Sequence, residues 1–380
     1  MPAFTPDAVR AAAPPDLDRR LAAAERAVAL APPSPEDEVW RYSRIDELDL
    51  DRFVPGRADT TVDAPAGVHV VHGGALDRVD DGETIDVFHE LNRAFMDAVV
   101  VSVPRGAVIE RPVVVTHRVH AAGTAVFPRL IVDAAEDSEI TVVEQFVSPG
   151  GLVALVVPRL EVDVAPAARL KYLGVNMLGG STWSLAHQRA LGARDSNTLL
   201  ATVALGGDYA RVRTEARVTG QGASTRQIAL YYADDRQMHD FRTLQDHAAP
   251  RTHSDLLFKG AVQDQAKSVY TGLIKIRHDA KGSQAFQTNR NLTLSSGAWA
   301  ESVPNLDIET NDVKCSHAST VGPIDEEQRF YLESRGIPPE IAERLVVLGF
   351  FDEVLEQLPV GPLAVQLREQ VGAKLARRTS

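Results

Sequence analysis

The sequence predicts a mainly β protein whose core is a β-solenoid, flanked by α-helical regions at its N- and C-terminal ends. Short Val-, Ile- and Leu-rich runs separated by small or polar residues, which are typical of short strands, fill residues 61–320. The strand pairs recur at steps of about 28 to 31 residues, and their turns align at Ser138, Ala167, Ser196, Ser224, Thr252 and Ser283. A fixed period in this range without a helical phase indicates stacked coils of strands.

The two most similar repeats show the alignment residue by residue. Leu130, Val132, Asp133 and Ile140 correspond to Leu160, Val162, Asp163 and Leu170, which lie 30 residues later. An antiparallel sandwich is the alternative interpretation. It would be unusually large for one domain, and its turns typically recur every 8 to 12 residues, so the solenoid is favoured.

The N-terminal region, residues 1–60, is rich in Ala, Pro and charged residues. The stretch "LDRRLAAAERAVALA" has helical spacing and ends at Pro32, which cannot continue a helix. The segment "EDEVWRYSRIDEL" follows, and we expect its aromatic residues Trp40 and Tyr42 to anchor this arm on the core.

The C-terminal region, residues 321–380, returns to helical patterns. Asp325 and Gln328 form a capping box at the start of a helix that runs to Gly336, a residue suited to the turn after a helix. A second helix, "EIAERLVVLGFFDEVLEQL", is expected to break or kink at Gly349, and a third covers "LAVQLREQVGAKLARR". Such helices can cover the end of a solenoid.

Composition and charge limit the possible partners. The chain has 380 residues, a formal net charge of -12 and a pI of about 5.4. Nucleic acid or an anionic membrane would require a basic face, so neither is expected as the main partner. The start of the chain has no apolar signal region, and no apolar run approaches about 18 residues, so we expect a cytoplasmic protein. A single cysteine excludes an internal disulfide.

The only cysteine, Cys315, is followed two positions later by His317 in "DVKCSHA". If this run is a strand, both side chains project from one face. A thiolate and an imidazole can bind iron, zinc or copper, but two ligands leave the coordination incomplete. Either the pair is structural, with the thiol packed as a small apolar group, or another subunit supplies the missing ligands. A Cys-His nucleophile is a rival, although no motif marks a nucleophile turn.

Other motifs are less informative. His247 and His253 flank the turn "HAAPRTH", but their spacing matches no common metal site. The chain contains no G-x-x-x-x-G-K-[ST] phosphate loop, so we expect no ATP site of that kind in it.

The stretch "NRNLTLSSGAWAESVPNLDIETNDVKCSHASTVGPIDEEQRFYLESRGIP" resembles the C-terminal core of the SufB/SufD family of iron–sulfur cluster assembly proteins. The run "DVKCSHAST", followed by "VGPIDEEQRFYLESRGI", is most similar to the SufD branch. "EDEVWRYSRIDEL" and "THSDLLFKGAVQDQAKSVYTGLIKI" are similar to earlier parts of the family pattern, so the resemblance covers most of the chain. Ala318-Ser319 departs from the Gly-Ala that the pattern leads us to expect, and both pairs are small.

The resemblance implies a right-handed parallel β-helix and a non-catalytic scaffold subunit of the SUF system. It implies a SufB-like paralogue that pairs through the C-terminal end of the β-helix, with a transient iron–sulfur cluster formed at the shared interface. His317 is the implied metal ligand and Cys315 a neighbouring contributor. A SufC-like ABC ATPase is implied to dock on the C-terminal helices, roughly residues 324–378. A reduced flavin accompanies the whole complex in the family, and a homodimer of the isolated chain is left open.

Two functions from other classes were weighed against this one. A β-helix enzyme acting on carbohydrate would use exposed carboxylates along a groove, but no clustered motif marks such a site. A stand-alone cysteine-dependent enzyme would need an oriented Cys-His pair and an oxyanion hole.

Overall fold

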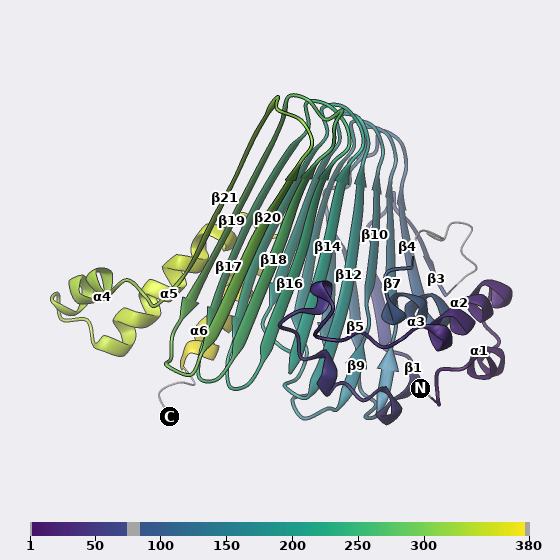
Figure 1. Ribbon diagram of the computed structural model, residues 1–380, viewed down its shortest axis with the longest axis horizontal. Coiled ribbons are helices and arrows are strands. Elements are labelled where there is room, and N and C mark those ends of the chain that lie inside the picture. The colour runs from purple at the N-terminus through teal and green to yellow at the C-terminus, as the bar shows by residue number, and fades with distance from the viewer. Residues whose placement is uncertain (1, 74–83, 377–380) are drawn as a thin grey trace.

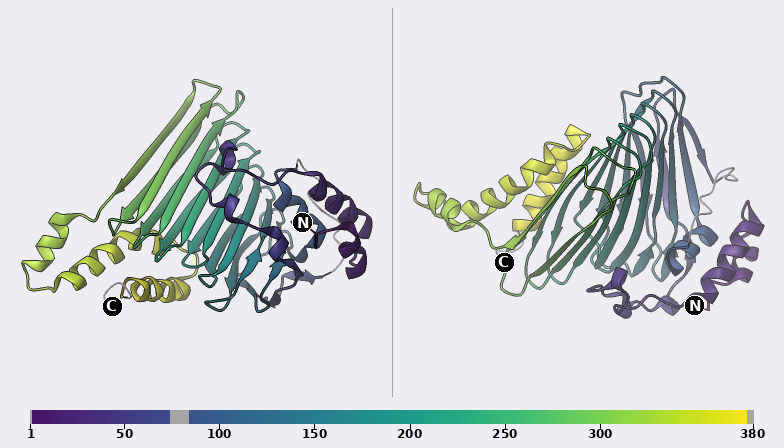
Figure 2. Two further views of the ribbon diagram at one scale, coloured as in Figure 1. Left: turned by 60° about the horizontal axis from the view of Figure 1, so that its bottom comes forward. Right: turned by 45° about the horizontal axis from the view of Figure 1, so that its top comes forward.

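The computed structural model describes residues 2–73 and 84–376 and forms one elongated stack of β coils (Figure 1). N-terminal helices lie beside its first coils, and the C-terminal helices lie along one sheet and do not cover the last coil. Two long sheets form the opposite walls of the stack, and each coil contributes a strand to each wall. Figure 2 shows that the N-terminal helices lie beside the first coils, whereas no described helix covers the last coil. Among the described residues, no helix is both long and apolar enough to cross a membrane.

The first sheet has nine strands along its main path. In spatial order these are β3 (His69–His72), β4 (Asp97–Val103), β7 (Pro128–Ala134), β10 (Arg159–Val164), β12 (Thr182–Gly192), β14 (Tyr209–Val218), β16 (Met238–His247), β18 (Lys267–Ile276) and β20 (Trp299–Ile308). Three short strands, β1 (Val54–Gly56), β6 (Thr124–Val126) and β9 (Ala154–Val156), extend it beside β12.

The second sheet also has nine strands. In spatial order these are β2 (Asp59–Asp63), β5 (Val113–Arg118), β8 (Glu139–Val147), β11 (Arg169–Met177), β13 (Asn197–Ala204), β15 (Ser224–Ala233), β17 (His253–Val262), β19 (Ser283–Thr293) and β21 (Val313–Gly322). The mainly β solenoid that the sequence predicts is therefore confirmed.

Strand pairing is parallel throughout the body of the stack, and its register is the one expected from the repeats. The structure pairs Leu130 with Leu160, Val132 with Val162, Asp133 with Asp163 and Ile140 with Leu170. Each coil thus lies on the equivalent residues of the coil before it. Two described pairs differ: β2 runs antiparallel to β5, and β3 runs antiparallel to β4.

One corner of the solenoid repeats the same turn from coil to coil. Asp137, Ala167 and Asp195 each adopt a left-handed backbone conformation, with φ of 57°, 59° and 57°. The next position holds a small buried residue, and the hydroxyls of Ser138 and Ser196 donate to backbone carbonyls three residues earlier, each at 2.7 Å. Small and polar residues recur here because the turn needs a tight backbone and a side chain that satisfies a buried carbonyl.

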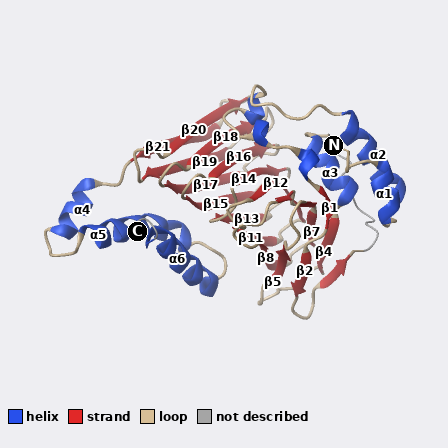
Figure 3. Cartoon of the chain, turned by 90° about the horizontal axis from the view of Figure 1, so that it is seen from below, coloured by secondary structure: helices blue, strands red, loops and turns tan. Residues whose placement is uncertain are grey.

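The C-terminal region contains α4 (Glu326–Glu333), α5 (Pro339–Leu355) and α6 (Gly361–Ala376). Asp325 caps α4 by accepting from two backbone amides of its first turn, as expected. Figure 3 shows α5 and α6 lying along the second sheet, whereas α4 projects beyond it. The expected break at Gly349 is wrong, because α5 is continuous through this residue. The cost of one helical glycine, about 1 kcal/mol, is offset by the apolar face that α5 buries.

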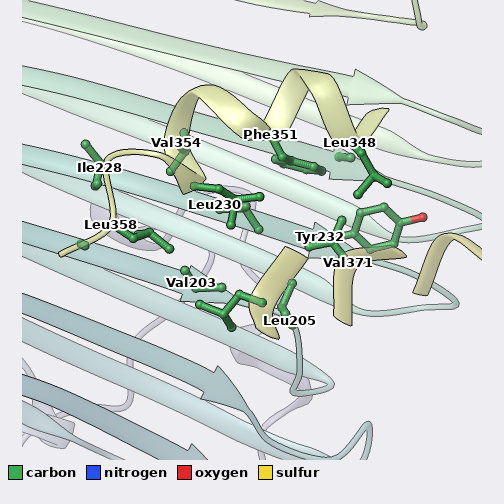
Figure 4. Close-up of a cluster of buried hydrophobic side chains, with 14 of the residues drawn as sticks. Val203, Leu205, Ile228, Leu230, Tyr232, Leu348, Phe351, Val354, Leu358 and Val371 are labelled. Atoms are coloured by element: carbon green, nitrogen blue, oxygen red, sulfur yellow. The ribbon is translucent and has the colours of Figure 1, made fainter. Parts of the chain in front are cut away.

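Apolar packing attaches α5 and α6 to the outer face of the second sheet. Phe351 of α5 and Val371 of α6 are fully buried against Val203, Leu230 and Tyr232 (Figure 4). This outer face is therefore a second core, separate from the core between the two sheets.

The N-terminal region contains α1 (Pro6–Ala12), α2 (Leu17–Ala29) and three single 3-10 turns at Glu38–Trp40, Ile45–Glu47 and Leu50–Arg52. The arm that carries these turns crosses the outer face of the first sheet. Trp40 is buried there, as expected, with the Arg211 guanidinium 3.9 Å from its ring centroid. Tyr42 stays exposed beside Trp299. A further helix, α3 (Val87–Phe95), interrupts the stretch expected to contain only strands.

Candidate functional site

The last coil of the solenoid is open. Among the described strands, β20 pairs with β18 alone and β21 pairs with β19 alone, so each forms the edge of its sheet. A sheet edge carries a row of backbone N–H and C=O groups that a further strand can bind. The two edges lie at the same end of the stack, on the side away from the N-terminal helices (Figure 1).

β21 directs Cys315 and His317 toward the space between the two sheets. Its register sets Cys315 beside Ala285 and His317 beside Gln287, and both partners are buried on the inner face of β19. Ser319 follows on the same face and donates to the hydroxyl of Ser302 of β20 at 2.7 Å. The prediction that Cys315 and His317 share one strand face therefore agrees with the structure.

Part of the inner face of this coil is apolar, and it is uncovered. Ile274 and Ile276 of β18 are 0% exposed, because β20 covers them. Their register partners Leu306 and Ile308 are 41% and 40% exposed, since no coil follows. The end of the solenoid thus presents a cross-section of its own core.

The environment of Cys315 does not favour a nucleophile. Its side chain is partly buried against an apolar cluster that includes Ile274 and Ala285, and this burial raises the pKa of the thiol. His317 is exposed, and no hydrogen bond joins it to Cys315. A Cys-His dyad needs a lowered thiol pKa and contact between the two groups, and neither is found here.

A complete metal site is also lacking. Within residues 2–73 and 84–376, no three His, Cys, Asp or Glu side chains gather where they could hold a metal ion. His247 and His253 form no such pair, because His247 is buried with its two ring nitrogens bonded to Thr252 and Ser254, each at 2.7 Å. Cys315 and His317 can therefore supply only part of a coordination sphere.

The C-terminal helices present a second candidate surface. Phe330 and Tyr331 of α4 are 70% and 55% exposed, which is unusual for two adjacent aromatic residues. A groove of about 840 Å³ lies between α4 and α5, and Leu345 and Phe350 are among the residues that line it. Exposed aromatic side chains beside a groove are typical of a protein-binding surface.

A buried lysine fixes α6 on the solenoid. The Lys374 ammonium donates to the carbonyls of Leu205 and Tyr232 at 2.7 and 3.1 Å and to Oε1 of Gln237 at 2.8 Å. It also forms an ion pair with Asp234 at 2.8 Å. The helical region is therefore joined to the coils by polar as well as apolar contacts.

Sequence reasoning missed the charged outer face of the first sheet. Asp240 is fully buried there and pairs with Arg211 at 2.5 Å and Arg242 at 2.6 Å. These arginines also donate to the backbone carbonyls of Val39 and Arg41, so they hold the N-terminal arm on the sheet. The available signal was a charge at every second position in "RVRTEARV" and at three of the four alternate positions in "DFRTLQD".

Comparisons with known proteins agree on one family. The model of the SUF system FeS cluster assembly SufBD core domain matches residues 117–350. An iron-sulfur cluster assembly SufBD family protein of Mycobacterium tuberculosis is 36% identical over 358 residues, covering 90% of this chain and 88% of the relative. The iron-sulfur cluster assembly protein SufD of Escherichia coli is 30% identical over 329 residues, covering 85% and 77%. That of Bacillus subtilis is 30% identical over 277 residues, covering 72% and 63%.

Proposed function

This chain belongs to the SufBD family of iron–sulfur cluster assembly proteins, and we propose that it is a SufD-like, non-catalytic scaffold subunit of the SUF system. Its role is to pair with a SufB-like chain through the open end of the solenoid and to form part of a cluster site there. The observation that carries this proposal is the last coil, whose inner face is uncovered and holds a thiol and an imidazole that no third candidate ligand joins among the described residues.

The open end supports pairing for two physical reasons. β20 and β21 offer unpaired backbone groups, which a partner solenoid could extend into a continuous sheet. Leu306 and Ile308 offer apolar surface that is about two-fifths exposed and becomes buried when a partner covers the coil. At about 1.5 to 3 kcal/mol for full burial of such a side chain, each contributes about 0.6 to 1.2 kcal/mol to association.

The donor set supports iron as the cargo. A thiolate and an imidazole are ligands found in iron–sulfur proteins, and thiolates from a partner would complete the set. We assign His317 as the ligand from this chain, because its imidazole is exposed at the open end. Cys315 lies on the same face but keeps its proton more firmly, so a metal must displace that proton before the thiolate binds.

Sharing the site between two chains would also allow release. A complete site on one rigid chain would retain its product, whereas a shared site weakens when the two chains move apart. We propose that this movement comes from a SufC-like ATPase bound at α4 and α5. The exposed Phe330 and Tyr331 support this location, and the attachment of α6 by Lys374 would transmit the motion to the coils.

The cluster role can be tested by co-expressing the chain with SufB-like and SufC-like partners. We expect His317→Ala to leave the complex assembled but to remove most of the iron and acid-labile sulfide bound after reconstitution. His253→Ala changes an exposed histidine of β17 in the same sheet and serves as the matched control. Equal cluster content in His317→Ala and the control would refute the ligand role.

The pairing surface can be tested separately. The double variant Leu306→Asp, Ile308→Asp places charges on the open face, so we expect a folded chain that no longer co-purifies with the SufB-like partner. Val108→Asp, which changes another exposed apolar residue in the early coils, should co-purify normally. Normal co-purification of the double variant would refute pairing through this end.

A further inference from the structure

The inner face of β19 carries three buried side-chain amides, which belong to Gln287, Asn289 and Asn291. Two of them have partners: Asn289 donates to the hydroxyl of Tyr231 at 3.0 Å, and Asn291 donates to Oδ1 of Asn289 at 2.8 Å. Gln287 is only 2% exposed, yet neither its Nε2 nor its Oε1 has a hydrogen-bond partner among the residues that the structure describes. The amide of Gln287 is therefore left to be satisfied from outside this set.

A buried amide in this state is costly. Its oxygen accepts and its nitrogen donates, and both groups lose their hydrogen bonds to water when the side chain is buried. Buried polar groups are therefore normally satisfied by another side chain, by the backbone or by ordered water. A leucine at this position would avoid the cost, so the question is which group binds the amide.

Strand register places the side chain of Gln287 beside His317. The two residues are direct partners on the adjacent parallel strands β19 and β21, so their side chains leave the same inner face about 4.8 Å apart. On the other side of Gln287, the register partner on β17 is Leu256, whose side chain is apolar. The imidazole of His317 is thus the polar group that the register sets next to the amide.

A glycine on the opposite sheet makes room for the amide at this level of the stack. A Cβ atom added to Gly272 of β18 would lie 2.5 Å from Nε2 of Gln287 and would also collide with the hydroxyl of Tyr270. Any larger residue at position 272 would therefore displace the amide. The register partner of Gly272 is Pro304 of β20, which belongs to the last coil, so this niche lies directly below the open end.

A histidine that binds a metal has a second ring nitrogen to satisfy. One nitrogen of the neutral ring coordinates the metal, and the other carries a proton that is almost always donated to a carboxylate, a carbonyl or water. That hydrogen bond fixes which nitrogen faces the metal and how the ring is turned. The side-chain carbonyl of Gln287 is an acceptor of this kind, one strand away from His317.

We propose that Gln287 is a positioning residue of the cluster site. Its Oε1 accepts the N–H of the His317 imidazole and thereby turns the other ring nitrogen toward the metal. A partner that covers the open coil excludes water from the niche, which strengthens this hydrogen bond and removes the competing acceptor. Gln287 acts only through His317, so this role rests on the proposed cluster function.

The complex with SufB-like and SufC-like partners provides the test. Gln287→Leu removes both polar groups at similar volume, so an iron chelator should remove the reconstituted cluster about 10- to 100-fold faster, the loss typical when the partner of a metal-bound histidine is removed. Gln287→Glu keeps an acceptor oxygen and should restore most of the retention. Gln227→Leu is the matched control. Gln227 is 1% exposed, its amide also has no described partner, and it lies in the same register column two coils earlier.

A spectroscopic measurement separates positioning from a purely structural role. Pulsed electron paramagnetic resonance of the reduced cluster detects the coupling to the nitrogens of a bound histidine. This coupling should change in Gln287→Leu, because the ring of His317 loses the hydrogen bond that orients it. It should stay unchanged in Gln227→Leu, which leaves that hydrogen bond in place.

The outcomes distinguish the two proposals. Equal chelator rates and equal nitrogen couplings in Gln287→Leu and Gln227→Leu, with the cluster lost in His317→Ala, would overturn the role of Gln287 and leave the cluster function intact. A cluster that persists in His317→Ala would overturn both. If urea denaturation shows that Gln287→Leu is unfolded, Gln287→Met provides the comparison, because methionine keeps the length of glutamine without its amide.

Discussion

Replacing Lys374 by methionine should loosen the C-terminal helices from the solenoid. Methionine keeps the length and the apolar stem of lysine but removes the ammonium. The substitution therefore leaves the carbonyls of Leu205 and Tyr232 without this donor and Asp234 without its cation, in a region where all three groups are shielded from water.

The size of the effect follows from these contacts. Breaking a buried ion pair by removing one partner costs about 3 to 5 kcal/mol, because the remaining charge is left uncompensated. The hydrogen bonds to the two carbonyls form part of the same loss and should not be added in full. The apolar packing of Phe351 and Val371 stays intact, so we expect a folded protein whose free energy of unfolding is about 3 to 5 kcal/mol lower.

Urea denaturation measures this free energy, and hydrogen exchange locates the change. Exchange should accelerate in α6 before it accelerates in the coils. The control is Arg368→Met on the same helix, which breaks the exposed pair with Asp352 and should cost about 0 to 1 kcal/mol. If Lys374→Met costs no more than Arg368→Met, the buried ammonium does not stabilise α6 in the way described.

Three further predictions concern other parts of the chain. Burial lowers the pKa of His239 to about 3 and of His247 to about 4, whereas histidines of the unfolded chain titrate near 6.5. As the pH falls from 7.5 to 5.5, these histidines gain protons only in the unfolded state. The free energy of unfolding should therefore drop by about 1.4 kcal/mol per histidine between these two pH values. Equal urea midpoints at pH 7.5 and 5.5 would contradict this prediction. Asp240→Asn leaves the buried Arg211 and Arg242 uncompensated, so it should lower the free energy of unfolding by about 3 to 5 kcal/mol and release the N-terminal arm. Release should expose Trp40, which a red shift of its fluorescence and faster proteolysis of the arm would report. An arm as resistant to protease as in the unchanged chain would show that Asp240 does not hold the arm on the sheet. Burial raises the pKa of Cys315, so iodoacetamide at pH 7.5 should alkylate it more slowly than a cysteine in a short peptide, and equal rates would show that the thiol is not shielded.

Most of the solenoid could be predicted from the sequence, because each coil repeats the same local pattern. The expected register of Leu130 with Leu160 and of Ile140 with Leu170 is the observed one. Helix α3 escaped prediction, because it is one short helix within a long run of strands. The continuity of α5 at Gly349 depends on tertiary packing, which a local rule for glycine does not contain.

The candidate site could be predicted only in part. The spacing of Cys315 and His317 was enough to place them on one strand face. The exposure of Leu306 and Ile308 was not predictable from their own strand, because the same alternation is buried in the preceding coils. The charged pairs beneath the N-terminal arm depend on the alignment of Arg211 with Asp240, which lie 29 residues apart, and a pattern within one strand cannot show this.

The two ends of the solenoid differ, and this difference limits the stoichiometry of any assembly. At the N-terminal end, β2 and β3 reverse direction, so the parallel stack is not simply continued there. Among the strands that the structure describes, only β20 and β21 form parallel edges above an uncovered core. A subunit that can bind a copy of itself through one end forms a dimer and no more, whereas a subunit that can bind through both ends polymerises into fibres. Pairing through β20 and β21 would therefore cover these two parallel edges and protect them from aggregation.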